Sequence, residues 1–184
     1  FERLNAVEIP VYLSYGNHDY WDPNQIHFDF PKNVHVFTTA VEAKTLTTKA
    51  QETVTIVGFS YGQRWLETDQ TTQFPPRAAT TYTIGTLHGS QSTASDADHY
   101  APFTLSELNQ LQYDYWALGH IHKRQILQER PYVIYPGNLQ GRHKNEPGEK
   151  GFYLVTAQAG QFELEFKPTT VIEWQRQRFE IPEN

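Results

Sequence analysis

The sequence predicts an α/β fold whose later part consists of consecutive antiparallel strands. A capping box, Thr104-Leu105-Ser106-Glu107, precedes apolar positions at helical spacing, which predicts a short helix up to about residue 111. No internal repeat or low-complexity segment divides the chain, so one domain is expected across residues 1–184. Short apolar runs with strand propensity occupy residues 11–15, 34–37, 54–59, 82–87 and 115–118.

Two hairpins are predicted near the end of the chain. Apolar runs at residues 125–127 and 132–135 flank a turn at Glu129-Arg130-Pro131. A second pair, at residues 152–155 and 162–166, flanks Gln158-Ala159-Gly160. The polar segment 65–76 is expected to be a surface excursion, and segment 90–102, which has no apolar period, is expected to be a loop.

Composition excludes several classes of function. The 184 residues contain no cysteine, which rules out disulfides, thiolate metal sites and a cysteine nucleophile. No apolar run approaches the roughly 18 residues that a membrane span needs, so no membrane partner is expected and the cytoplasm is the expected location. The net charge of −6 argues weakly against binding nucleic acid by bulk charge alone.

Imidazole and amide side chains follow three of the predicted strands directly. Asn17 and His18 come after the first strand, His88 after the strand at 82–87, and His120 and His122 after the strand at 115–118. Loops at the carboxyl edge of an α/β sheet converge there, so these groups are expected to meet.

Their chemistry suits divalent metals. Imidazole binds borderline ions, and an amide oxygen suits harder ones. His120 and His122 lie two apart, so they face the same way on an extended segment, or reach two adjacent ions if the loop turns. Two ions roughly 3.5–4 Å apart can clamp a phosphate and generate a nucleophile. His18 follows Asn17 directly and is placed beside the ions either for a general acid or for a group that stabilises the phosphorane charge.

These motifs resemble the calcineurin-like metallophosphoesterase superfamily. Gly16-Asn17-His18-Asp19, Leu87-His88-Gly89 and Gly119-His120-Ile121-His122 are similar to its last three motifs, in the same order. Residues 135–140, Tyr-Pro-Gly-Asn-Leu-Gln, and 148–155 narrow the resemblance to the DNA-repair exonuclease branch, with its SbcD-type and YhaO-type nucleases. The resemblance covers nearly the whole chain and implies part of a mixed β-sandwich flanked by helices.

The resemblance also implies roles for single residues. Asn17, His88 and His120 would bind one metal ion, and His122 would bind the other. His18 would be the catalytic histidine. Asp19 would not bind metal itself but would stabilise the loop that carries the ligands. The implied cofactor is a pair of Mn²⁺ ions, although these donors also accept Zn²⁺ or Fe²⁺.

The sequence departs from the family pattern before residue 16. The family's Asp-x-His and Gly-Asp-x-x-Asp motifs are absent there, and residues 1–15 contain no Asp and no His. The chain is therefore expected to be the C-terminal portion of a catalytic domain, truncated at both ends relative to the family. It is expected to hold a partial metal site and to be inactive by itself.

Other residues carry weaker signals. Lys123, Arg124, Arg142 and Lys144 are candidates for phosphate contacts, with solvated surface charge an equal alternative. Three histidines without motif context are expected to be ordinary surface or strand residues, with His99 also able to border the site; the three are His27, His35 and His99.

Three functions remain open on this basis. The first is a manganese exonuclease acting on DNA ends in DNA repair, with an SMC-like ATPase subunit as partner and a homodimeric intact protein. The second is a phosphatase or phosphodiesterase for small molecules on the same fold. The third is a non-catalytic binding module. The resemblance at residues 135–140 favours the first for the intact protein.

Overall fold

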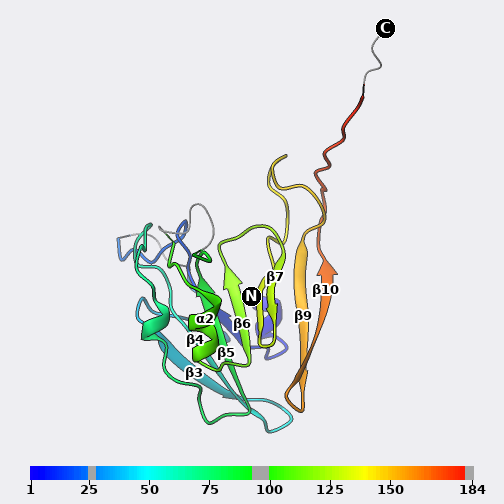
Figure 1. Ribbon diagram of the computed structural model, residues 1–184. Coiled ribbons are helices and arrows are strands. Elements are labelled where there is room, and N and C mark those ends of the chain that lie inside the picture. Colours follow the sequence, from blue (N-terminus) through cyan, green and yellow to red (C-terminus); the bar gives the residue numbers. More distant parts are fainter. Residues whose placement is uncertain (25–27, 93–99, 181–184) are drawn as a thin grey trace.

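The computed structural model describes residues 1–24, 28–92 and 100–180, and the fold in these ranges is built from three sheets and few helices (Figure 1). The sheets are a six-stranded mixed sheet, a parallel pair and an antiparallel pair. The elements are α1 (Glu2–Asn5), β1 (Val11–Leu13), β2 (Val34–Val36), β3 (Glu42–Thr47), β4 (Thr53–Gly58), the 3₁₀ turn η1 (Thr71–Gln73), β5 (Tyr82–His88), α2 (Leu105–Gln110), β6 (Tyr115–Gly119), β7 (Gln125–Glu129), β8 (Tyr132–Tyr135), β9 (Gly151–Gln158) and β10 (Gln161–Pro168).

The six-stranded sheet has the order β3-β4-β5-β6-β8-β7. Strands β4, β5, β6 and β8 run parallel, and the edge strands β3 and β7 pair antiparallel with their neighbours. The parallel register places His88 opposite Gly119 at the end of β5 and β6. The carboxyl ends of the central strands therefore share one edge, which is where ligands bind in open α/β sheets.

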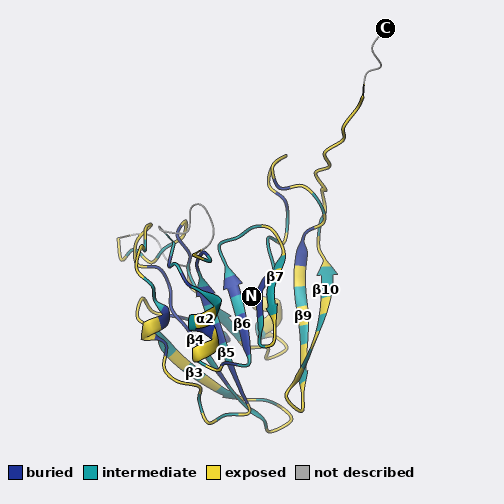
Figure 2. Cartoon of the chain, in the orientation of Figure 1, coloured by how far each residue is buried: buried dark blue, intermediate teal, exposed yellow. Residues whose placement is uncertain are grey.

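The main hydrophobic core lies on the face of this sheet that α2 covers. Trp116 of β6 is fully buried and stacks on Tyr113, with 5.0 Å between the ring centroids. Leu108 of α2 is also fully buried, and the burial map shows buried colour concentrated on the central strands (Figure 2). The capping box is present, because Thr104 Oγ1 accepts from the Glu107 N–H while the Glu107 carboxylate accepts from the Thr104 N–H.

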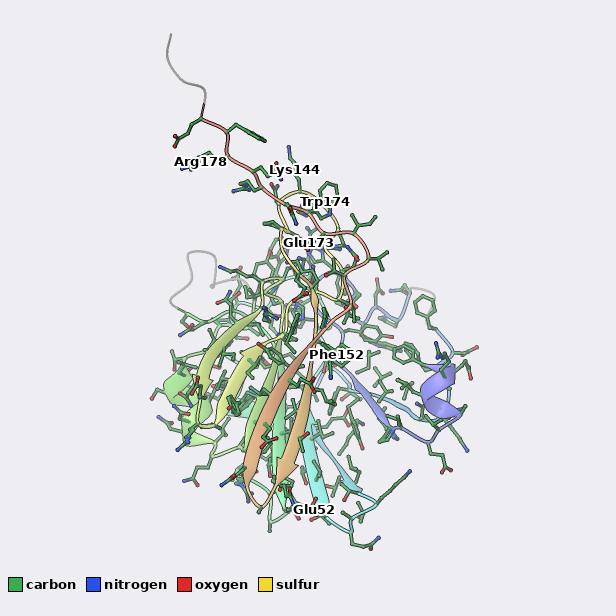
Figure 3. The ribbon with its side chains drawn as sticks, turned by 90° about the vertical axis from the view of Figure 1, so that its right-hand side faces the viewer. Glu52, Lys144, Phe152, Glu173, Trp174 and Arg178 are labelled. Atoms are coloured by element: carbon green, nitrogen blue, oxygen red, sulfur yellow. The ribbon has the colours of Figure 1, made fainter. Side chains whose placement is uncertain are left out.

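The β9–β10 ribbon packs on the opposite face of the sheet. Phe162 of β10 contacts Tyr82 of β5 and Tyr115 of β6, at 5.5 and 6.0 Å between ring centroids. Its residues alternate between partly buried and exposed, so one face of the ribbon packs and the other meets solvent. Figure 3 shows the ribbon between α2 on one side and the N-terminal segment on the other.

The parallel pair β1–β2 brings the N-terminal segment to the sheet. Ser14 Oγ lies 3.1 Å from Thr86 Oγ1 of β5, and Tyr61 N–H donates to the Tyr15 carbonyl at 3.0 Å. The end of β1 therefore arrives beside the end of β5. In the described ranges no helix has the length and apolar character needed to cross a bilayer.

The structure confirms the α/β class, the capped helix and both hairpins, and it corrects two expectations. Segment 65–76 is not a simple surface excursion, because Phe74 is buried against Trp116, with 5.3 Å between centroids. The described residues of the expected loop at 90–102 form no helix or strand, although Ala101 is buried, and residues 93–99 lie outside the described residues. The last part is not wholly antiparallel, because β8 pairs parallel with β6.

Candidate metal centre

The site forms where the ends of β1, β5 and β6 meet. A cleft of about 760 Å³ opens there, and it is lined by Asn17, His18, Asp19, His88, His120, Ile121, His122, Gly137, Asn138, Leu139, Gln140 and Arg142. All four expected metal-binding residues and the expected catalytic histidine line this one cleft. The sequence expectation that three separate strands deliver these groups to one place is therefore matched by the geometry.

Asn17 and His88 are already in contact. Asn17 Oδ1 lies 2.9 Å from His88 Nε2, and Asn17 is almost fully buried. The buried amide oxygen and the imidazole nitrogen thus point at each other across the gap between β1 and β5. This is a pair of donors of the kind that a divalent ion accepts.

Two glycines make room for the His88 ring. A Cβ placed on Gly16 would overlap this imidazole, and one placed on Gly119 would lie 2.9 Å from its Nδ1. The glycine of the first motif and the glycine at the end of β6 are therefore required by close approach to His88. Tyr61 closes the site from behind, with its ring edge-on to His88 at 5.3 Å between centroids.

His88 is held in its neutral form. Burial, reinforced by the nearby His120, His122 and His18 rings, lowers the pKa of His88 to about 3. A neutral imidazole is the form that binds a metal ion.

His120 lies beside His88, with 5.3 Å between the ring centroids, and packs on Tyr100 at 4.4 Å. The backbone of His120 has a φ of 97°, which residues other than glycine rarely adopt. The chain therefore turns at His120 instead of continuing as an extended strand. Of the two arrangements expected for His120 and His122, the structure has the turned one.

His122 has a buried carboxylate as its partner. Its Nδ1 lies 2.6 Å from Oε1 of Glu146, and Oε2 of Glu146 accepts from the backbone N–H of Arg142 at 2.8 Å. Burial raises the pKa of Glu146, but these two hydrogen bonds and the charges of His122 and His143 outweigh it and lower the pKa to about 2. Sequence reasoning missed Glu146, which lies 24 residues after His122 in a polar loop without a motif.

The remaining expected residues are placed as follows. His18 and Asp19 are exposed in the cleft wall, and Asp19 Oδ1 accepts from the Gly16 N–H at 2.7 Å, which supports the loop. Of the proposed phosphate contacts, Arg142 lines the cleft, while Lys123 and Arg124 do not. The Arg124 guanidinium instead lies over the Phe166 ring at 3.6 Å.

Of the histidines without motif context, His35 is exposed on β2 and stacks on Tyr12. His27 and His99 lie outside the described residues.

The donors fit a divalent ion in part. Asn17, His88 and His120 form a mixed oxygen and nitrogen set that suits Mn²⁺, Zn²⁺ or Fe²⁺. Within residues 1–24, 28–92 and 100–180, no three His, Cys, Asp or Glu side chains converge as a metal-binding group. The site described here is therefore short of the carboxylates that a pair of ions usually has.

No protein-family model matches this chain. Over its full length the chain is 41% identical, across 185 residues, to the protein called "Uncharacterized metallophosphoesterase YhaO" from Bacillus subtilis (strain 168). The chain spans 45% of the length of that relative. The chain is thus similar over its full length to part of a metallophosphoesterase, and this stretch contains the histidine and asparagine cleft at the strand ends.

Proposed function

We propose that the cleft is part of a metal-dependent phosphodiesterase centre, and that the intact protein is an exonuclease acting on DNA ends with Mn²⁺. The observation that carries the proposal is the convergence of Asn17, His18, His88, His120 and His122 on one cleft from three strand ends. Residues 137–140, within the segment that resembles DNA-repair exonucleases, line the same cleft. The proposed partners are an SMC-like ATPase subunit and a second copy of the intact protein, with DNA repair in the cytoplasm as the setting.

Each residue has a part in this proposal. Asn17, His88 and His120 hold one ion and His122 holds the other. Bound divalent ions supply Lewis acidity and lower the pKa of water in the site. His18, exposed in the cleft wall, carries a proton on its imidazole to the leaving oxygen. Arg142, also in the wall, offers its guanidinium to a phosphate oxygen.

Two carboxylates near the cleft already have other partners, which limits the metal binding and activity proposed for the 184-residue chain alone. Glu146 is engaged with His122, and Asp19 supports the backbone of Gly16. With no further carboxylate converging on the described imidazoles, the chain alone is proposed to bind Mn²⁺ weakly and to turn over little substrate.

The test uses the intact protein with and without Mn²⁺. Its substrates are double-stranded DNA labelled at either end, bis-p-nitrophenyl phosphate and cyclic nucleotides. Release of nucleotides from the DNA ends, abolished by a chelator, supports the proposal. Hydrolysis of the small esters with intact DNA ends assigns the site to small-molecule substrates and overturns the exonuclease. No hydrolysis of any substrate, with Mn²⁺ still bound, assigns a binding module instead.

A matched pair of variants ties the activity to the cleft. Asn17→Ala removes the buried amide oxygen beside His88 and is expected to abolish Mn²⁺-dependent hydrolysis. Asn145→Ala makes the same chemical change at an exposed position and is expected to leave it unchanged. Equal activity in the two variants would show that the reaction does not take place at this site.

A further inference from the structure

The contact between His122 and Glu146 differs from an ordinary surface ion pair. His122 is 41% exposed, whereas the Glu146 side chain is only 7% exposed. Exposed ion pairs contribute little to stability, because solvent screens them and their side chains lose conformational freedom. A buried carboxylate must instead have donors for its oxygens. Both Glu146 oxygens have one, His122 Nδ1 at 2.6 Å and the Arg142 N–H at 2.8 Å.

The neighbouring cations contribute less to this carboxylate. Arg142 Nη2 and His143 Nε2 lie 3.9 and 3.8 Å from Glu146 Oε1, beyond hydrogen-bond distance. The His122 ring is thus the closest side-chain partner of Glu146. An ionised carboxylate only accepts hydrogen bonds, so the imidazole must donate from Nδ1.

We infer that Glu146 is a positioning residue for the metal-binding function of His122. It holds the imidazole as the Nδ1–H tautomer, so that Nε2 carries the lone pair into the cleft. Carboxylates that accept the second N–H of a metal-binding histidine fix its tautomer and its ring orientation in this way. This inference rests on the proposed function for the metal, but the tautomer itself is a property of the metal-free chain.

The loop that carries Glu146 is anchored by the C-terminal segment. Trp174 Nε1 donates to the Gly141 carbonyl at 3.1 Å, and Gly148 N–H donates to the Trp174 carbonyl at 2.9 Å. The Gln140 amide bonds to Val171 N–H at 2.8 Å and the Ile172 carbonyl at 2.7 Å. Figure 3 shows Trp174 of this segment close to Lys144 of the loop. Residues 171–174 therefore set the position of the carboxylate that orients His122.

The test is a long-range ¹H–¹⁵N spectrum of the histidine rings in the metal-free 184-residue chain at pH 7.5. His122 is assigned by comparison with His122→Gln. The expected result is the Nδ1–H pattern for His122 in the wild type, and its loss or mixing with the Nε2–H pattern in Glu146→Gln. An Nε2–H pattern in the wild type, or an unchanged Nδ1–H pattern in Glu146→Gln, overturns the inference.

Glu149→Gln is the matched control. It removes the same charge from an exposed position in the same loop and is expected to leave the tautomer of His122 unchanged. Glu146→Asp keeps a carboxylate and is expected to retain the Nδ1–H pattern at least in part. If Glu146→Gln does not fold, the Asp variant decides, and an Nε2–H pattern there contradicts the assigned role.

A Mn²⁺ titration supplies the second readout through paramagnetic broadening of the His122 ring signals. Glu146→Gln is expected to need about 10- to 100-fold more Mn²⁺ than the wild type or Glu149→Gln for the same broadening. Equal Mn²⁺ demand in all three chains overturns the positioning role. If no histidine of the wild type broadens at any Mn²⁺ concentration, the proposed metal function fails, while the tautomer measurement still judges the Glu146–His122 contact.

Discussion

His88 Nε2 lies 2.9 Å from Asn17 Oδ1, although 71 residues separate the two along the chain. The contact joins the loop after β1 to the end of β5, and it is possible because Gly16 leaves space for the imidazole.

Gly16→Ala is expected to destabilise the chain, because its Cβ would overlap the His88 ring. Overpacking of this kind costs about 1–3 kcal/mol in free energy of unfolding. Urea unfolding of the metal-free chain measures it. Gly62→Ala is the control, since its Cβ would lie no closer than 3.0 Å to its neighbours, the Cγ2 and Cβ atoms of Thr39. Equal stability of the two variants would show that the loop at Gly16 relaxes away from His88.

His18→Ala in the intact protein is expected to lower the turnover number by about 10²–10⁴-fold while leaving Mn²⁺ affinity close to that of the wild type. The reason is that His18 is exposed in the cleft wall and is not one of the proposed ligands. Turnover and Mn²⁺ binding are measured on the same preparations, with His35→Ala on β2 as control. A parallel loss of Mn²⁺ would make His18 a ligand and remove its assignment as the acid.

The stability of the metal-free chain is expected to fall as pH decreases from about 6.5 towards about 3. The pKa of His88 is about 3 in the folded chain against 6.5 for an ordinary histidine. Between these values the unfolded chain binds a proton that the folded chain does not, so protons favour unfolding. The contribution is complete above pH 6.5 and lost as pH falls through the folded pKa.

The measurement is the free energy of unfolding in urea at several pH values from 7.5 to 5.5, which stays above the window, from 4.5 down to about 2, in which the pKa shift of Glu146 contributes. His88→Gln is expected to reduce the slope of the free energy of unfolding against pH, by an amount that corresponds to the uptake of up to one proton. His35→Gln, at an exposed position, is expected to keep the slope of the wild type. A wild-type slope in His88→Gln would mean that other groups take up the proton.

Thr104→Ala is expected to lower the free energy of unfolding by about 0.5–2 kcal/mol, because it removes the side-chain acceptor of the capping box. The Thr104 hydroxyl accepts from Glu107 N–H at 3.2 Å, and α2 carries the fully buried Leu108. Ser106→Ala, at an exposed position of the same helix, is the control. If both cost the same, the cap contributes nothing measurable.

Much of the fold was predictable because its signals are local. The capping box at Thr104 and the turn at Ala159-Gly160 involve residues that contact each other within a few positions of sequence. Strand β3 was missed for an equally local reason. Its inward positions include Glu42 and Lys44, which pair with each other at 3.2 Å, so the apolar alternation of a strand is absent.

The burial of Phe74 could not be predicted from the local sequence pattern either. It lies in a polar segment, yet its ring contacts the ring of Phe59, directly after β4, and that of Trp116 in β6. Trp21, by contrast, follows the Gly16–Asp19 motif closely and is 40% exposed. A single aromatic residue carries no period, so only the assembled sheet decides whether it is covered.

The sequence by itself determined which residues could form the metal site, because Asn17, His18, His88, His120 and His122 each follow a strand and strand ends share an edge in an α/β sheet. Only the tertiary structure decided how the donors are held. The closeness of Gly16 and Gly119 to His88 and the contact of Glu146 with His122 depend on the packing of separate segments. Hydrogen bonds and close approaches of this kind leave no periodic trace along the chain, and for that reason the positioning carboxylate became visible only in three dimensions.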